Sequence, residues 1–140
     1  MCVRLVLRDG GKDAAMLGTK DTQATVAVRD LKAARKFYEG TLGLKAAEGG
    51  DVDPPVYQTG KSRLLVYESQ YAGTNKATSV TWDVGRDVER VMEWLKGRGV
   101  TFEHYDLPGA TVKGDVHLIG PGKAAWFKDP EGNIHAVVGR

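Results

Sequence analysis

The sequence predicts an α+β fold of two tandem βαβββ modules, and three observations lead to this prediction. Residues 24–28 and 80–84 each alternate apolar and other side chains, which is typical of a half-buried strand. Each run precedes a segment with apolar residues at helical spacing that ends at a glycine. The two halves align at a shift of about 56 residues, which places Val28 on Val84 and Gly43 on Gly99, and such a repeat constrains the whole topology.

Length and composition limit the class of protein. A chain of 140 residues with ordinary apolar and charged fractions is typical of one globular domain. The net charge is only +2, with lysines and arginines spread along the chain, so we expect no nucleic-acid binding. The single cysteine excludes an internal disulfide and a cysteine-based zinc cluster. No apolar run reaches membrane-spanning length and no secretory signal is recognisable, so we expect a cytoplasmic protein that does not bind membranes.

The first 20 residues differ from the rest. VRLVL, at positions 3–7, has the composition of a short strand, whereas the following RDGGKDAA is polar and turn-rich. We interpret residues 1–20 as an N-terminal extension that either adds an edge strand or is not native, with Met16 as the alternative start. Residues 21–140 then form a single domain, with module one at 21–72 and module two at 77–140.

Module one continues from its first strand into a helix. Asp30 is suited to cap that helix, because its carboxylate can accept hydrogen bonds from the first turn. Gly43 is suited to end it, because glycine readily adopts the left-handed conformation of a helix terminus. VYQTG and RLLVYES follow as two strands with Gly60 at the turn between them. The polar stretch at 69–78 is the connection to module two.

Module two repeats this order. Asp87 is the expected helix cap, Gly99 the expected helix end, and strands follow around TFEHY, AAWF and IHAVV. The corner DPEGN, at 129–133, predicts a hairpin turn, because proline fixes φ and Gly132 tolerates positive φ. The segment 106–123 is long and rich in glycine, which is typical either of a lid or of an ordinary flexible connection.

VRDLKAARKFYEGTLGL in module one and AWFKDPEGN in module two resemble the vicinal oxygen chelate superfamily, which groups glyoxalase I, bleomycin-resistance proteins and extradiol dioxygenases. Both segments fall where the repeat places them, and the resemblance covers nearly the whole chain. It implies that the modules form a curved mixed sheet around a cleft, with the helices on the outer face. The modules would pair within one chain or across a homodimer.

The metal enzymes of this superfamily hold a divalent ion in that cleft, usually with His, Gln and Glu side chains. The resemblance places the four ligand positions at Gln23, Leu64, Ser79 and Ala136. Only Gln23 carries a suitable donor, because serine is a poor neutral ligand and the other two have no donor atom. We therefore expect no metal and no other cofactor, with a divalent metal held by shifted ligands as the alternative.

The three histidines do not restore this site. A one-residue shift would bring His135 to the last-strand position, but it would turn Val137 into the cleft and reverse the alternation of the strand. We therefore expect His135 on the helix-facing side or at the rim. His104 and His117 have no partner histidine at ligand spacing, and Glu68 is expected to be a solvated surface carboxylate.

The concave face is then the candidate site for a small ligand. Alternation along the first strand of each module presents amide, hydroxyl and carboxylate groups there, and two aromatic residues are expected nearby. The predicted ligand-binding residues are Gln23, Thr25, Tyr57, Ser79, Thr81, Asp83 and Trp126. Asp83 is also the candidate for a catalytic base, the alternative being a polar residue at a strand edge.

Three functional classes follow. The first is a small-molecule-binding protein of the bleomycin-resistance type, which binds an aromatic or polar ligand without metal. The second is a glyoxalase-like lyase or isomerase, or a dioxygenase-related enzyme, either metal-free or metal-dependent. The third is a regulatory or interaction module. The missing metal ligands favour the first class. A homodimer is expected, because members of the superfamily often dimerise and Trp94 lies on a helix flank.

Overall fold

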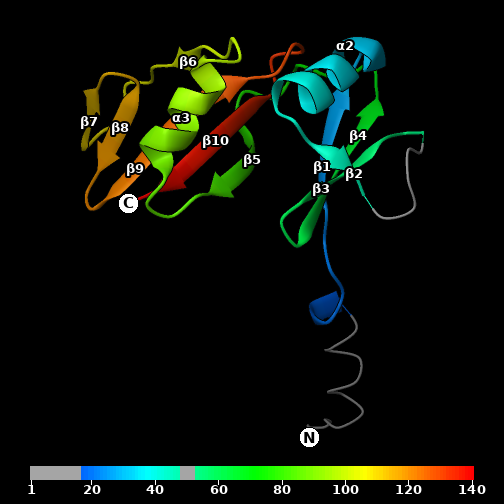
Figure 1. Ribbon diagram of the computed structural model, residues 1–140, viewed down its shortest axis with the longest axis horizontal. Coiled ribbons are helices and arrows are strands. Elements are labelled where there is room, and N and C mark those ends of the chain that lie inside the picture. The colour runs from blue at the N-terminus through cyan, green and yellow to red at the C-terminus, as the bar shows by residue number, and fades with distance from the viewer. Residues whose placement is uncertain (1–16, 48–52) are drawn as a thin grey trace, which may run out of the picture.

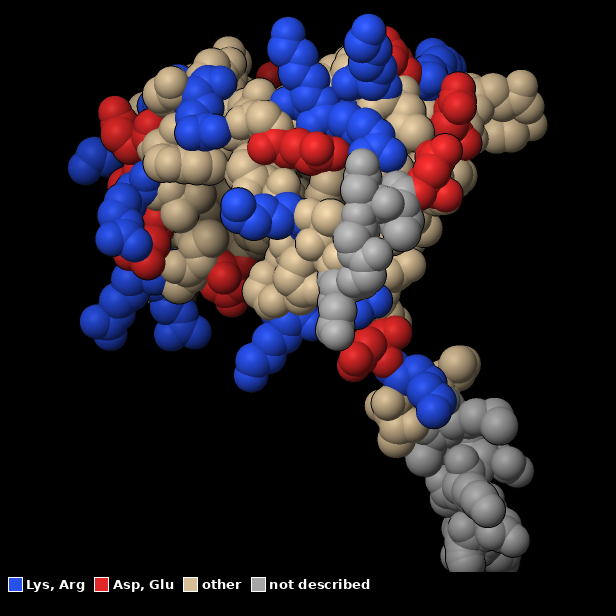
Figure 2. Space-filling model, turned by 45° about the vertical axis from the view of Figure 1, so that its right-hand side comes forward, with Lys and Arg blue, Asp and Glu red and all other residues tan. Residues whose placement is uncertain are grey.

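A computed structural model of the chain describes residues 17–47 and 53–140. The predicted strand at 3–7 and the alternative start at Met16 lie outside the described residues. Each half of the chain builds its own sheet, with helices against one face, and the two sheets lie side by side (Figure 1). Positive and negative side chains are interspersed on the face shown in Figure 2. In the part of the chain that the structure describes, no helix is long and apolar enough to cross a membrane.

The first sheet and its helical segment are called module one below. Its four strands have the order β1-β4-β3-β2, and β1 runs parallel to β4 while the other pairs are antiparallel. The elements are β1 (Ala24–Val28), α2 (Leu31–Arg35), η1 (Lys36–Thr41, a π-helical continuation of α2), β2 (Lys45–Ala46), β3 (Val56–Thr59) and β4 (Ser62–Glu68). Asp30 caps α2 as predicted, since its Oδ1 accepts the Ala33 N–H at 3.1 Å.

The second sheet and its helix are called module two. Its strands have the order β5-β10-β9-β8-β7, and β6 also pairs with β9. The elements are β5 (Thr78–Asp83), α3 (Val88–Lys96), β6 (Phe102–Glu103), β7 (Ala110–Lys113), β8 (Val116–Ile119), β9 (Gly122–Lys128) and β10 (Ile134–Gly139). The α+β class is therefore confirmed, with parallel and antiparallel pairs in both sheets. The interpretation of 106–123 as a lid or flexible loop was wrong, because β7 and β8 form a hairpin there that widens the sheet.

The core lies between the sheets and their helices, and the alternation in β1 and β5 decides which residues enter it. Val26 is 2% exposed, while its neighbour Thr25 points to the opposite face, called the open face below. In module two, Trp82 packs on the helix side and stacks on Phe127, with ring centroids 6.2 Å apart. Buried residues of both modules form one cluster, which includes Val28, Tyr38, Leu42, Tyr57, Val66, Val88, Met92, Leu95, Phe102, Phe127 and Val137.

The DPEGN corner forms the predicted hairpin turn between β9 and β10, and Asp129 organises it. Its Oδ1 accepts the backbone N–H groups of Glu131 (2.9 Å) and Asn133 (2.8 Å). Its Oδ2 accepts the Tyr38 hydroxyl (2.7 Å) and the Asn133 side-chain amide (2.8 Å). Because Tyr38 belongs to η1, this carboxylate joins the turn of module two to the helical segment of module one.

The same corner also holds the end of β1. A carboxylate oxygen of Glu131, Oε2, accepts the backbone N–H groups of Arg29 (2.8 Å) and Asp30 (3.0 Å). The Asn133 amide donates to the Ala27 carbonyl oxygen at 2.8 Å. These groups supply partners to the backbone at the point where β1 ends and α2 begins. The corner therefore fixes one end of module one against module two.

His135 lies at the centre of this junction, on the helix side of β10. It is fully buried, and its Nε2 lies 2.8 Å from the Tyr38 hydroxyl oxygen. Since Tyr38 has a single hydroxyl proton and donates it to Asp129, the Nε2–H of His135 donates to the Tyr38 oxygen. Nδ1 then carries no proton and has no partner among the described residues. Burial lowers the pKa of His135 from its ordinary 6.5 to about 4.

We expect stability to fall as the pH drops from about 6.5 towards 4, because the unfolded chain takes up the His135 proton in this range and the folded chain resists it. The free energy of unfolding should decrease by about 2 kcal/mol between pH 7.5 and pH 5.0. Urea denaturation at the two pH values measures this difference. His135→Gln should remove most of the pH dependence, whereas His104→Gln, at an exposed position, should keep it; equal pH dependence in all three proteins would contradict the assignment.

Candidate functional site

A groove opens between the two modules, away from the DPEGN corner. β1 pairs with β4 and β5 pairs with β10, and no ladder in the described residues joins β1 to β5. The groove has a volume of about 720 Å³, which is in the range of pockets for small organic ligands. Its lining combines residues of both modules: Thr22, Ala24, Leu44, Gln58, Thr59, Gly60, Ser62, Arg63, Leu64, Ser79, Val80, Thr81, Trp82 and Asp83.

The wall from module two contains three of the predicted site residues. Ser79, Thr81 and Asp83 follow one another along β5 at alternate positions, so their side chains share the open face. Asp83 is exposed, and its Oδ1 accepts the Gly85 N–H at 3.0 Å. This hydrogen bond holds the carboxylate at the end of the strand, where it lines the groove.

The wall from module one is formed largely by the β3–β4 hairpin. Gln58 braces the hairpin, because its amide donates to the carbonyl oxygens of Gly60 (2.8 Å) and Ser62 (3.1 Å). Arg63 extends from the hairpin, and its side chain forms no hydrogen bond or ion pair with the described residues. Predicted residue Gln23 lines an adjoining polar hollow, which shares Arg63 with the groove. Sequence reasoning missed Arg63, because the arginine becomes notable only when the hairpin is placed against β5.

Two other predicted residues lie away from this groove. Thr25 is exposed on the open face of β1 but does not line the groove. Tyr57 was expected near the concave face and is instead 1% exposed in the core, where it is paired across strands with Leu64. Its ring stacks on Tyr38 with centroids 6.1 Å apart, and its hydroxyl donates to Glu39 at 2.8 Å. The alternation along β3 assigns Tyr57 to the helix side, because its neighbours Val56 and Gln58 are half-buried and exposed.

The strand registers show which residues lie at the ligand positions that the resemblance implies. Thr81 pairs with Ala136 in module two, and the repeat places Thr81 on Thr25, which pairs with Leu65. The counterpart of Ala136 is therefore Leu65 and not Leu64, whose side chain is buried on the helix side. Neither Ala136 nor Leu65 has a donor atom, so the correction leaves the donor set unchanged.

An indole also covers the last-strand position. Trp126 of β9 pairs with Ala136, which in turn pairs with Thr81 of β5. The indole Nε1 donates to the Thr78 hydroxyl of β5 at 3.1 Å, so the Trp126 ring reaches across β10. Ala136 beneath this span is only 2% exposed. Trp126 therefore lies on the open face, as predicted, but its ring fills space there and lies outside the groove between the modules.

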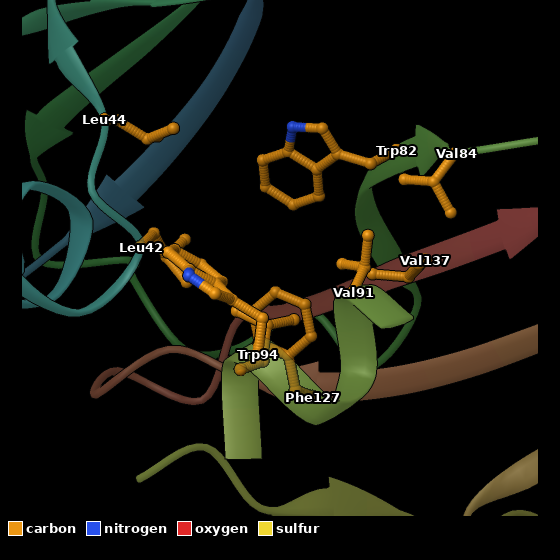
Figure 3. A pocket seen from close by; sticks show the side chains of 9 residues that line it. Leu42, Leu44, Trp82, Val84, Val91, Trp94, Phe127 and Val137 are labelled. Carbon is orange, nitrogen blue, oxygen red and sulfur yellow. The ribbon is translucent and has the colours of Figure 1, made fainter. Parts of the chain in front are cut away.

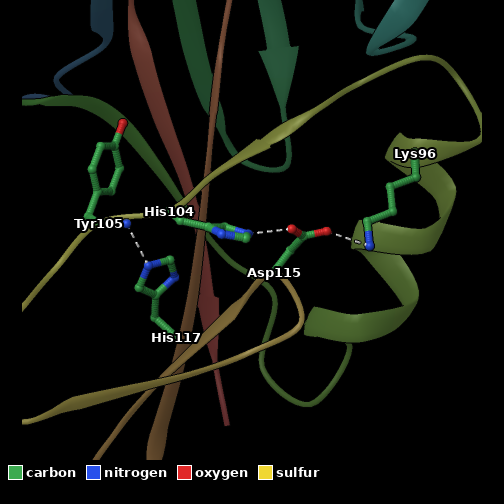
Figure 4. A network of polar contacts seen from close by, with 5 residues as sticks. All are labelled: Lys96, His104, Tyr105, Asp115 and His117. Carbon is green, nitrogen blue, oxygen red and sulfur yellow. Dashed lines mark hydrogen bonds and ion pairs between the residues drawn. The ribbon is translucent and has the colours of Figure 1, made fainter.

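The remaining histidines, His104 directly after β6 and His117 in β8, lie near each other (Figure 4). His104 and Lys96 bind the two oxygens of Asp115 at 2.6 Å and 2.7 Å, and the bond from Lys96 followed by that from His104 lowers the Asp115 pKa. His117 is fully buried, and its Nε2 accepts the Tyr105 N–H at 3.0 Å. The ring centroids of His104 and His117 are 6.2 Å apart. This proximity could not be predicted while 106–123 was interpreted as a loop.

The residues present do not fit the superfamily's metal. Among the described residues, no group of three or more His, Cys, Asp or Glu side chains has an arrangement that could hold an ion. Gln23 and Ser79 are the two polar residues at the ligand positions that the resemblance implies, and the other two positions, Leu65 and Ala136, carry no donor atom. His135, which a shifted register would have offered as a ligand, points to the helix side and is bonded to Tyr38.

Comparisons with solved structures agree with this architecture. The chain is similar to a glyoxalase family protein from Enterococcus faecalis, with 16% identity, a TM-score of 0.63 and coverage of 88% of this chain and 99% of that one. It is similar to the fosfomycin resistance protein FosX from Mesorhizobium loti, with 12% identity, a TM-score of 0.59 and coverage of 86% and 92%. It is also similar to a lactoylglutathione lyase from Agrobacterium tumefaciens, with 17% identity, a TM-score of 0.59 and coverage of 86% of this chain and 93% of that one. At these identities the likeness shows the fold alone.

A search of curated proteins found no match. A family model described as the Glyoxalase/Bleomycin resistance protein/Dioxygenase superfamily matches residues 22–136, which include both segments that carried the resemblance in the sequence and all the elements from β1 to β9. The chain therefore belongs to the glyoxalase/bleomycin resistance protein/dioxygenase superfamily.

Proposed function

We propose that the protein binds a small organic molecule in the groove between the modules and does so without the metal of the superfamily's enzymes. The groove itself is the observation that carries this proposal, because it joins hydroxyl, amide and charged groups from both modules around an apolar base that contains Trp82. A few orienting polar groups around an apolar surface are typical of small-molecule sites.

Binding without turnover is favoured by the groups that the groove lacks. At two of the positions where the superfamily's metal enzymes carry ligands, this chain has side chains without donor atoms, Leu65 and Ala136. Asp83 is the carboxylate in the groove and remains the candidate for a catalytic base in a metal-free lyase or isomerase. Among the described residues that line the groove, no second carboxylate and no histidine is present to divide acid and base roles with it. Sequestration of a ligand, as in bleomycin-resistance proteins, is therefore the preferred activity.

We also propose that the protein is a cytoplasmic homodimer. Trp94 of α3 is 48% exposed, and large aromatic side chains are enriched at subunit contacts. Sedimentation velocity over a range of protein concentrations tests the assembly. The expected result is one species with the mass of two chains, and a monomer at all concentrations would contradict it.

We expect purified protein to contain no stoichiometric divalent metal, because the donor set is incomplete. Elemental mass spectrometry measures the metal content of protein prepared without chelators or a histidine tag. Gln23→Ala, which removes the best remaining donor, should give the same result. Near-stoichiometric nickel, zinc, iron or manganese that decreases in Gln23→Ala would contradict the metal-free proposal and indicate a metal enzyme.

A ligand of the groove should be displaced by filling the groove. Thr81→Trp adds an indole to an exposed position on the β5 wall, whereas Thr111→Trp makes the same change on β7, outside the groove. In a thermal-shift screen of small organic molecules, compounds that stabilise the natural protein should lose their effect in Thr81→Trp and keep it in Thr111→Trp. Retention of all stabilising compounds in Thr81→Trp would place their binding elsewhere and contradict the proposal.

A further inference from the structure

An apolar recess lies on the helix side of the same junction (Figure 3). Trp82, Val91 and Trp94 of module two face Leu42 and Leu44 of module one across it, and all nine lining residues are apolar. Its volume is about 130 Å³. A cavity of roughly 150 Å³ with an apolar lining takes up benzene, so the recess has the size and chemistry for one aromatic ring.

The recess is bounded by fixed elements. Arg98, which follows α3, donates to the carbonyl oxygens of Thr41 and Gly40 at the end of η1. Its guanidinium also lies 4.6 Å from the centroid of the Trp94 ring, which is within cation–π range. These contacts hold the end of η1 and the Trp94 indole, which borders the recess, in fixed positions relative to each other. The recess is therefore present before any ligand binds.

The recess and the polar groove adjoin each other. Leu44 and Trp82 line both, so the two spaces meet at these side chains. A ligand that extends past Leu44 and Trp82 would contact the apolar recess at one end and the polar groove at the other. The two spaces together are thus suited to a molecule with one apolar and one polar end.

The charges in the groove indicate which polar end fits. Arg63 has no partner among the described residues, whereas Asp83, the carboxylate in the lining, already accepts the Gly85 N–H. Lys61 and Arg63 of the β3–β4 hairpin both line the adjoining hollow, together with one carboxylate, Asp21, so cations outnumber carboxylates among its described residues. An unpaired guanidinium binds a carboxylate with two parallel hydrogen bonds.

We propose that the ligand class is a single-ring aromatic carboxylate, with its ring in the recess and its carboxylate at Arg63. This inference rests on the proposed function, because it names the kind of molecule that the same cleft binds. The ring would be held between Leu44 and Trp82 on one side and Val91 on the other, and the carboxylate would select the orientation.

Isothermal titration calorimetry with benzoate, phenylacetate, 3-phenylpropanoate and 4-phenylbutanoate tests the proposal, because the series varies the spacing between ring and carboxylate. At least one member should bind, and its uncharged amide should bind about ten-fold more weakly. Arg63→Gln should lower the affinity for the acid to the affinity for its amide. Lys61→Gln, on the same hairpin but outside the groove lining, should leave the difference between acid and amide unchanged.

Val91→Phe should abolish binding of both acid and amide by filling the recess, while Val112→Phe, at an exposed position on β7, should not. Leu44→Phe fills the recess from the opposite wall, and circular dichroism identifies a variant that does not fold.

Equal binding of acid and amide, no effect of Arg63→Gln, or full binding by folded Val91→Phe and Leu44→Phe would overturn the proposal. If none of the four acids binds, but Thr81→Trp abolishes the stabilisation by compounds from the thermal-shift screen, the proposed ligand class is wrong while the proposed function stands. If none of the acids binds and Thr81→Trp has no effect on the screening compounds, both proposals are wrong.

Discussion

The arrangement of the molecule depends on the Asp129 carboxylate, which accepts four hydrogen bonds while only 5% exposed. Two of these bonds close the turn between β9 and β10. The closed turn places Glu131 and Asn133 where their side chains bind the backbone at the end of β1. Removal of the carboxylate would leave several buried donors without partners, and each such donor costs about 1–3 kcal/mol. One side chain therefore links a local turn to the position of the other half of the chain.

The groove is a consequence of where this link lies. The corner joins the modules at the end of β1 and the start of α2, and Arg98 joins them again at the end of η1. Between β1 and β5 the described chain has no backbone ladder, so the space beside these strands is lined by side chains. Trp82 occupies the boundary of that space, with its ring stacked on Phe127 and its edge shared by groove and recess. The packing that stabilises the core thus also shapes the candidate site.

Much of the fold could be predicted from the sequence, because alternation, caps and turn residues are local signals. Asp30, Gly60 and the DPEGN corner act as their types predict. Residues 106–123 were misread, because glycine marks both hairpin turns and loose loops, and pairing with β9 decides between them. The site was harder to predict. Alternation placed Ser79, Thr81 and Asp83, but Tyr57 depends on the register of β3, and Arg63 acquires meaning only across the two modules.

The strand order has a consequence for association between copies of the chain. Free strand edges can pair with other molecules, and proteins limit this with short or covered edges. Here the outer edge of the first sheet is β2, a strand of two residues. The outer edge of the second sheet is formed by β7, a strand of four residues that ends at Lys113, and by β6, a strand of two residues that pairs only with β9 among the described strands. The longer edges of β1 and β5 face into the junction between the modules. The described edges therefore offer little backbone for a continuous intermolecular sheet, and contacts between copies would be made by side chains.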